Sequence, residues 1–108
     1  MSGFVLYDQT EESYVRFHGI GDHSLDVCEV ELVESADEAT RISGKHKRVI
    51  EKFLLAQTVT VNLDDLAFCG HISETITGME HVEGLVWVNM NLPDTDAVLA
   101  SATQVIRR

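Results

Sequence analysis

A cysteine and two histidines lie close together within residues 67–84. Zinc prefers thiolate and imidazole ligands, and a thiol beside an imidazole can also act as a nucleophile. Cys69 and His71 are two positions apart, so they share one side only if the chain is extended there. No second close pair of Cys or His completes a zinc pattern, which favours a buried thiol and surface imidazoles. The alternative is zinc bound by Cys69, His71 and His81, or a small-ligand or catalytic pocket that Trp87 also lines.

Two charged stretches are the other candidate sites. Alternate residues of a strand share a face, so Glu29 and Glu31 would form a row of carboxylates. Such a row can imitate a phosphate backbone. Charge on an edge strand also prevents aggregation, and this edge-strand role is the favoured interpretation of the row. The acidic row consists of Glu29, Glu31, Glu34, Asp37 and Glu38. The basic helix holds five of the chain's eight Lys and Arg residues, which are Arg41, Lys45, Lys47, Arg48 and Lys52.

The overall charge limits the classes of partner. The chain has 18 acidic and 8 basic residues and a formal net charge of −10. This charge argues against direct binding of nucleic acid or anionic membranes and favours a protein with a basic surface. No apolar run could span a bilayer, and the N-terminus lacks the pattern of a signal peptide. The two cysteines are far apart and form no disulfide framework. We therefore expect a cytoplasmic protein with reduced thiols.

The common catalytic motifs are missing from the sequence. It contains no phosphate-binding glycine loop, no nucleophile elbow and no HExxH zinc motif. These absences remove several common enzyme families but do not remove catalysis as such.

The first half of the chain begins with a hairpin signal. Residues 3–8 and 13–18 are aromatic and β-branched runs joined by a short polar loop. Residues 25–34 predict a longer strand, with a bulge near Cys28 because the apolar positions change parity there. Residues 35–38 fit a capping box, and apolar residues at helical steps predict a main helix over residues 45–57.

The second half mixes strand and helix signals. Residues 58–63 alternate cleanly and predict a strand. Residues 64–69 predict a turn of helix that Gly70 ends, and the β-branched content of residues 71–77 favours a strand over one helix across 64–77. Residues 84–93 predict an inner strand, because both of its faces begin apolar. Residues 94–108 predict an amphipathic helix.

These elements predict a single compact domain over residues 1–108. Its expected class is α+β, with a mostly antiparallel sheet of five or six strands and two helices packed on one face. We expect a non-catalytic protein–protein interaction or regulatory and inhibitory domain that occupies a basic or nucleic-acid-binding surface of its partner. A bipolar charge pattern also complements itself under a two-fold axis, so a homodimer is a further expectation.

Overall fold

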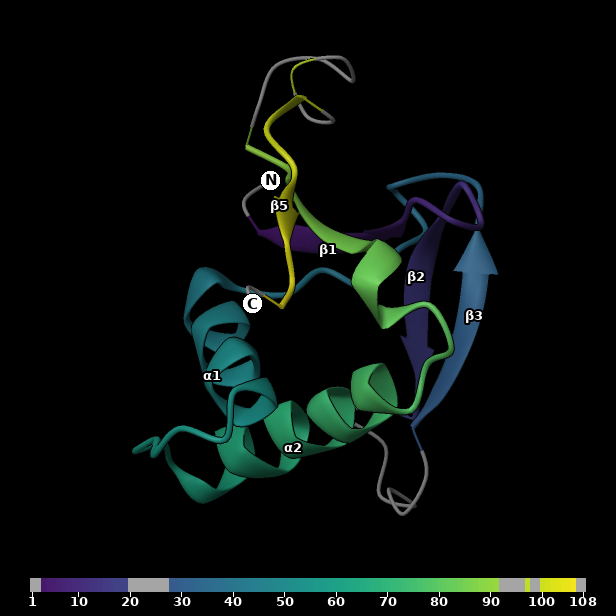
Figure 1. Cartoon of the computed structure of the whole chain (residues 1–108). Helices are drawn as coiled ribbons and strands as arrows, with labels where there is room; N and C mark the ends of the chain where they lie inside the picture. Colours follow the sequence, from purple (N-terminus) through teal and green to yellow (C-terminus); the bar gives the residue numbers. More distant parts are fainter. Residues whose placement is uncertain (1–2, 20–27, 92–96, 98–99, 107–108) are drawn as a thin grey trace.

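The structure, a computed structural model, describes residues 3–19, 28–91, 97 and 100–106. Among these residues, five strands form one antiparallel sheet in the order β3-β2-β1-β4-β5. Two helices lie together on one side of it (Figure 1). The expected α+β class is therefore confirmed. The elements are β1 (Phe4–Asp8), β2 (Ser13–His18), β3 (Glu29–Val33), α1 (Gly44–Leu54), α2 (Leu63–Thr77), the 3-10 turn η1 (Val82–Gly84), β4 (Leu85–Asn89) and β5 (Thr103–Gln104).

The predicted β1–β2 hairpin is confirmed, and a buried carboxylate organises its turn. Asp8 Oδ1 accepts hydrogen bonds from the backbone N–H groups of Thr10 at 2.9 Å and Glu11 at 3.2 Å. Aspartate often closes turns in this way, because its short side chain reaches amides two and three residues ahead. One side chain therefore satisfies two backbone donors of the turn, and the Gln9 N–H donates to the Gly84 carbonyl at 2.9 Å.

Beyond this turn, β1 and β2 separate, and residues 40–42 fill the space between them. Phe4 and Ile42 exchange two backbone hydrogen bonds of 2.8 Å. The Thr40 N–H donates to the Val15 carbonyl at 3.2 Å, and Thr40 Oγ1 accepts from the Phe17 N–H at 2.7 Å. This inserted segment supplies partners that β1 and β2 would otherwise give each other, so the buried backbone groups stay satisfied.

Each face of the sheet has its own apolar cluster. The helix side joins residues of both helices to β1, β2 and β4, whereas the opposite side is covered by residues 36–39 and parts of the chain near its C-terminus. The buried residues of the helix side are Leu6, Val15, Phe17, Ile42, Val49, Ile50, Cys69, Ile72, Ile76, Leu85, Trp87 and Val105. Those of the opposite side are Val5, Tyr14, Val33, Ala39, Val86 and Val88.

Helix α1 is close to the predicted main helix but ends three residues earlier. Its N-cap is Ser43, whose hydroxyl accepts from the His46 N–H at 3.1 Å. Ala56 has a positive φ of 54°, which ends the helical path. The predicted capping box at residues 35–38 begins no helix. Residues 36–38 form a turn instead, and Ser35 Oγ accepts from the Asp37 N–H at 3.1 Å.

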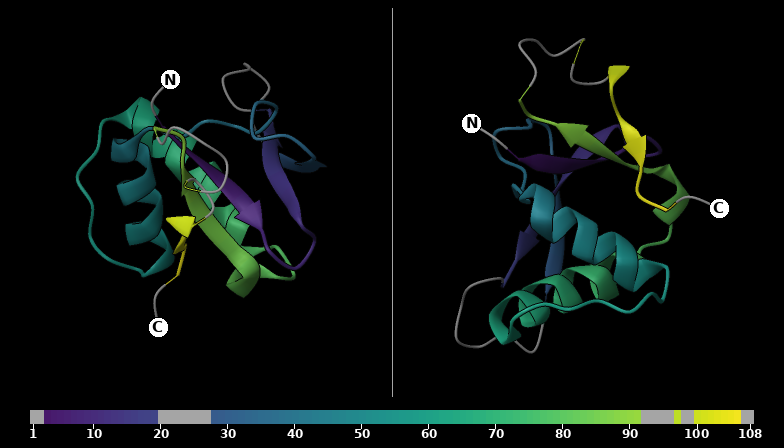
Figure 2. Two further views of the ribbon diagram at one scale, coloured as in Figure 1. Left: turned by 90° about the horizontal axis from the view of Figure 1, so that it is seen from above. Right: turned by 90° about the vertical axis from the view of Figure 1, so that its left-hand side faces the viewer.

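Helix α2 corrects two predicted strands. Residues 58–62 form an irregular connector that runs back beside α1, so α2 starts near the N-terminal end of α1 (Figure 2). Asn62 then caps α2 by accepting from the Asp65 N–H at 2.8 Å. The strand predicted over residues 71–77 is also wrong, because one helix covers 63–77. Its buried apolar residues, Cys69, Ile72 and Ile76, recur at helical spacing and all pack into the helix-side core.

The C-terminal part contains another correction. Residues 94–108 were expected to be helical, but Thr103 and Gln104 form β5 and pair with Trp87 and Val86 of β4. Ala97 and Ala100 are helical, as expected, whereas residues 101, 102, 105 and 106 are not; residues 94–96, 98, 99, 107 and 108 lie outside the described residues. The predicted bulge near Cys28 depends on residues 25–27, which are also outside them. In the described part of the chain, no helix is long and apolar enough to cross a bilayer.

Candidate interaction surface

The three candidate zinc ligands do not gather. Cys69 and His71 both lie on α2, where residues two positions apart point in different directions. His81 lies in the turn after α2, and its Nε2 is 4.0 Å from Glu11 Oε1. Within the described ranges, no group of three His, Cys, Asp or Glu side chains could hold a metal ion. The extended chain that the zinc hypothesis requires is absent at residues 69–71.

Cys69 also has the wrong environment for a nucleophile. Its side chain is fully buried, and its Sγ lies 3.9 Å from the His46 carbonyl oxygen. Burial raises the pKa of this thiol to about 11, because the interior disfavours the thiolate. A catalytic cysteine needs the opposite shift, so Cys69 is a structural thiol of the α1–α2 interface.

Trp87, which the ligand-pocket hypothesis places in the lining of a pocket, is buried in the helix-side core. Trp87 is 1% exposed, and the Nζ of Lys47 lies 5.6 Å from the centre of its ring. A shallow hollow of about 330 Å³ lies elsewhere, between η1 and the segment around β5. The described residues around it are Val82, Glu83, Gln104 and Ile106.

A polar cluster joins the N-terminal ends of the two helices. Asp65 Oδ2 accepts from Lys45 Nζ at 2.8 Å and from Asn62 Nδ2 at 2.8 Å, and its Oδ1 accepts from His46 Nε2 at 2.6 Å. The hydrogen bonds from Lys45 and His46 lower the pKa of Asp65 to about 2. Because every donor is aimed at one carboxylate, the cluster ties the helices together and leaves no free base.

The five bases of the predicted basic helix divide into three groups. Lys45, Arg48 and Lys52 are exposed at positions i, i+3 and i+7 of α1, so they form one stripe, which we call the basic stripe. Arg41 precedes the helix and lies 3.7 Å from Asp37. The remaining member, Lys47, is turned toward the sheet and is not available to a partner.

Lys47 instead covers the aromatic part of the helix-side core. Its Nζ lies 5.1 Å from the ring centre of Phe4, whose ring meets that of Trp87 edge-on. Glu51, one turn further along α1, accepts from the same ammonium at 2.7 Å. The side chain is therefore held by a carboxylate and two π faces at once.

The acidic row continues over several segments. Glu29 and Glu31 are exposed on β3, where they lie opposite His18 and Arg16 of β2. His18 Nε2 also hydrogen bonds to Glu31. The remaining members of the row, Glu34, Asp37 and Glu38, follow β3 in the exposed turn that leads toward the inserted segment.

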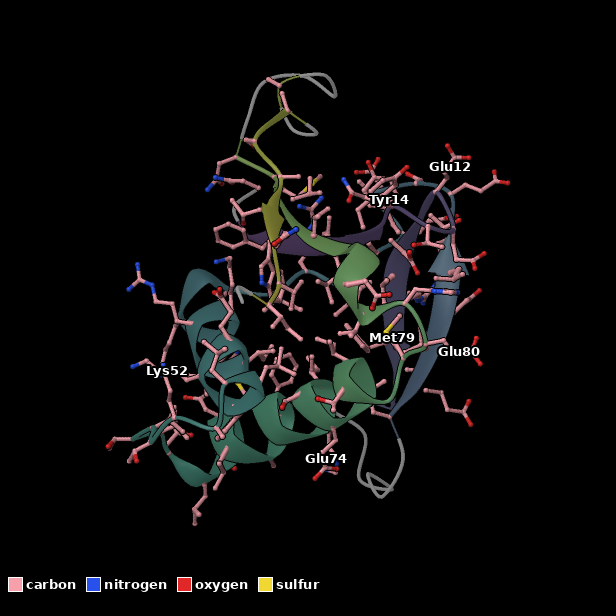
Figure 3. The ribbon with its side chains drawn as sticks, viewed as in Figure 1. Glu12, Tyr14, Lys52, Glu74, Met79 and Glu80 are labelled. Carbon is pink, nitrogen blue, oxygen red and sulfur yellow. The ribbon has the colours of Figure 1, made fainter. Side chains whose placement is uncertain are left out.

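The fold adds carboxylates that the sequence hypothesis did not include. β3 ends opposite the start of β2, so Glu34 comes close to the hairpin turn that carries Glu11 and Glu12. Figure 3 shows Glu12 and Glu80 on the same side of the molecule as β3, and Lys52 on the opposite side. We call this set the acidic surface; its exposed members are Glu11, Glu12, Glu29, Glu31, Glu34, Asp37, Glu38 and Glu80.

Comparison of the chain with family models, with curated proteins and with solved structures found no match.

Proposed function

We propose that this chain is a non-catalytic interaction domain that binds a protein with a basic surface through the acidic surface. The observation that carries the proposal is the separation of charge. Eight exposed carboxylates from four segments gather on the β3 side, whereas the basic stripe lies on α1. Complementary charge speeds association and selects the partner, and this arrangement suits a basic one.

The same surface suits a regulatory or inhibitory role. Regularly spaced carboxylates along β3 and its adjoining turns resemble a run of phosphates, so a nucleic-acid-binding surface is the kind of partner surface that fits. Binding there would exclude nucleic acid from the partner. The charge of −10 makes direct contact of this chain with nucleic acid unfavourable.

Affinity capture from a native lysate at increasing salt tests the proposal. The test variant changes Glu29, Glu31 and Glu34 to Gln. The control changes Arg48 and Lys52, the two bases of the basic stripe that lie outside the Asp65 cluster, to Gln. We expect the acidic variant to weaken capture by about tenfold or more, and salt to weaken capture by the wild-type chain. The control should capture the same protein as wild type.

Two results would overturn this function. One is capture that does not change with salt or with the acidic variant. The other is a partner that prefers the acidic variant. If the captured protein also binds DNA or RNA, displacement of this chain by added nucleic acid then tests the inhibitory role.

A second copy of the chain is the other partner that the charge separation supports. The acidic surface of one copy would meet the basic stripe of the other, in both directions, about a two-fold axis. Light scattering at low and high salt measures this directly. A mass of one chain at every salt concentration would exclude the homodimer and leave the basic partner protein unaffected.

A further inference from the structure

One edge of the sheet has no neighbouring strand among the residues that the structure describes. β3 is the last strand in the order β3-β2-β1-β4-β5, and no described strand pairs with its outer side. Leu32, in the middle of β3, is 43% exposed, although it is a large apolar residue. The backbone groups that point outward from β3 decide whether this edge can accept another strand.

The inserted segment identifies those groups. In an antiparallel sheet, a residue's N–H and C=O point to the same neighbour, and successive residues alternate between neighbours. Thr40 lies on the side of β2 away from β3, and it bonds to Val15 and Phe17. These two residues therefore turn their backbone groups away from β3. Their register partners on β3 are Leu32 and Val30, respectively, so those two residues face outward.

A contact at the start of β3 agrees with this assignment. Cys28 has the same parity as Val30 and Leu32, so its carbonyl should also point outward. The Thr75 hydroxyl of α2 donates to that carbonyl at 3.3 Å. Among the described residues, none donates to or accepts from the outward groups of Val30 and Leu32. The open edge therefore offers two N–H and two C=O groups in the pattern of a strand.

The side chains of β3 specify the chemistry of a strand that pairs there. Residues opposite Val30 and Leu32 would share their apolar face, on which Val30 packs against the helix-side core and Leu32 is exposed. The partner residue between those two would stand opposite Glu31, and the partner residue that follows the one opposite Val30 would stand opposite Glu29. A partner strand therefore alternates aliphatic and basic residues, because cross-strand pairs of like polarity and opposite charge are favourable.

A second copy of β3 does not meet this requirement. Antiparallel self-pairing through the outward groups would match Val30 with Leu32 and place Glu31 directly opposite Glu31. Facing residues in such a pair are about 4.5–5.5 Å apart, and two carboxylates at that distance repel each other. The charge on the edge thus excludes the chain's own β3 and selects a basic strand.

We infer that β3 is a docking edge, to which an extended partner segment of alternating aliphatic and basic residues adds as a further strand. This inference deepens the proposed function and rests on it, because it assigns the partner's binding element. Backbone hydrogen bonds to Val30 and Leu32 give affinity, as in other strand-addition complexes. The acidic side chains of β3 select the sequence.

Two methylated peptides test the inference on the unchanged protein. Both are short blocked peptides of alternating valine and lysine, with equal length and charge. In the first, the valine amides are N-methylated, which removes the donors aimed at Val30 and Leu32. In the second, the lysine amides are N-methylated, and these point away from β3. We expect the first peptide to bind about tenfold or more weakly than the second.

Hydrogen exchange gives a second readout that does not depend on affinity. In the free protein, the amides of Val30 and Leu32 should exchange faster than those of Glu29, Glu31 and Val33, which face β2. The lysine-methylated peptide should slow exchange at Val30 and Leu32. A variant with Glu29→Lys and Glu31→Lys should no longer bind the valine–lysine peptide. It should instead bind a peptide of alternating valine and glutamate.

The outcomes separate this inference from the proposed function. Equal binding of the two methylated peptides, with unchanged exchange at Val30 and Leu32, overturns strand addition while charge-dependent binding stands. Capture of a basic protein without any peptide binding also overturns strand addition. Failure of both the peptides and the salt-dependent capture overturns the proposed function itself.

Discussion

Replacing Thr40 with valine removes one hydrogen-bond acceptor from the junction between β1 and β2. Valine has nearly the same shape as threonine, and the backbone bond from Thr40 N–H to Val15 remains. The Phe17 N–H, however, loses the hydroxyl that it meets at 2.7 Å. This donor faces away from β3 and toward the inserted segment, so no strand residue can replace the acceptor.

The expected cost follows from that one unsatisfied donor. A buried N–H without a partner costs about 1–3 kcal/mol, whereas the net contribution of a typical hydrogen bond is smaller. The free energy of unfolding of such domains is about 5–15 kcal/mol, so the change is a sizeable fraction of it. The melting temperature should fall by about 4–8 °C for each kcal/mol.

Urea unfolding followed by circular dichroism measures the change, with Thr40→Ser as the control. Serine keeps the hydroxyl and loses one methyl group, which should cost about 0.8 kcal/mol or less. The order of stability should be wild type, then serine, then valine, with similar m-values. A valine variant as stable as wild type, or more stable than the serine variant, would refute the role assigned to the Thr40 hydroxyl.

Three further predictions concern the core and the helix interface. The folded-state pKa of Asp65 is about 2, below its ordinary 3.8, so the wild type should lose stability as pH falls from about 4 to 2. Asp65→Asn removes this titrating group, so the melting temperature of the variant should fall less over the same pH range. A thiol reagent should modify Cys28 in the folded protein but reach Cys69 only at the rate of unfolding, because Cys69 is buried and its pKa is raised to about 11; fast labelling of both would contradict the burial. Lys47→Met should keep the packing of the stem and lose about 0.5–2 kcal/mol of cation–π attraction in urea unfolding, and an unchanged midpoint would show that the ammonium contributes nothing.

The elements that depend on local pattern were predictable from the sequence. The β1–β2 hairpin follows from two aromatic and β-branched runs joined by a short polar loop, and β4 follows from a run that is apolar on both faces. Helix α1 follows from apolar residues at helical steps. Helix α2 was missed because Ile72, Thr75 and Ile76 are β-branched residues, which favour strands in isolation. Burial at helical spacing outweighs that preference, and the Thr75 hydroxyl bonds back to the His71 carbonyl at 2.8 Å.

The candidate surface was predictable only in part. Alternation along β3 places Glu29 and Glu31 on one face, but the approach of the hairpin turn with Glu11 and Glu12 depends on strand order. Sequence spacing alone cannot supply that order. The position of Lys47, by contrast, could have been predicted from the sequence, because Lys45, Arg48 and Lys52 share a helical face that does not include Lys47.

The placement of the aromatic residues has a practical consequence for spectroscopy. Trp87, the single tryptophan of the sequence, is buried on the helix side of the sheet. Both tyrosines, Tyr7 and Tyr14, pack on the opposite side with ring centres 4.9 Å apart. Each face thus carries its own natural chromophore. Tryptophan emission should report the detachment of the helices from the sheet. Tyrosine absorbance should report the loss of packing on the opposite side of the sheet, so the two sides can be monitored separately without an added dye.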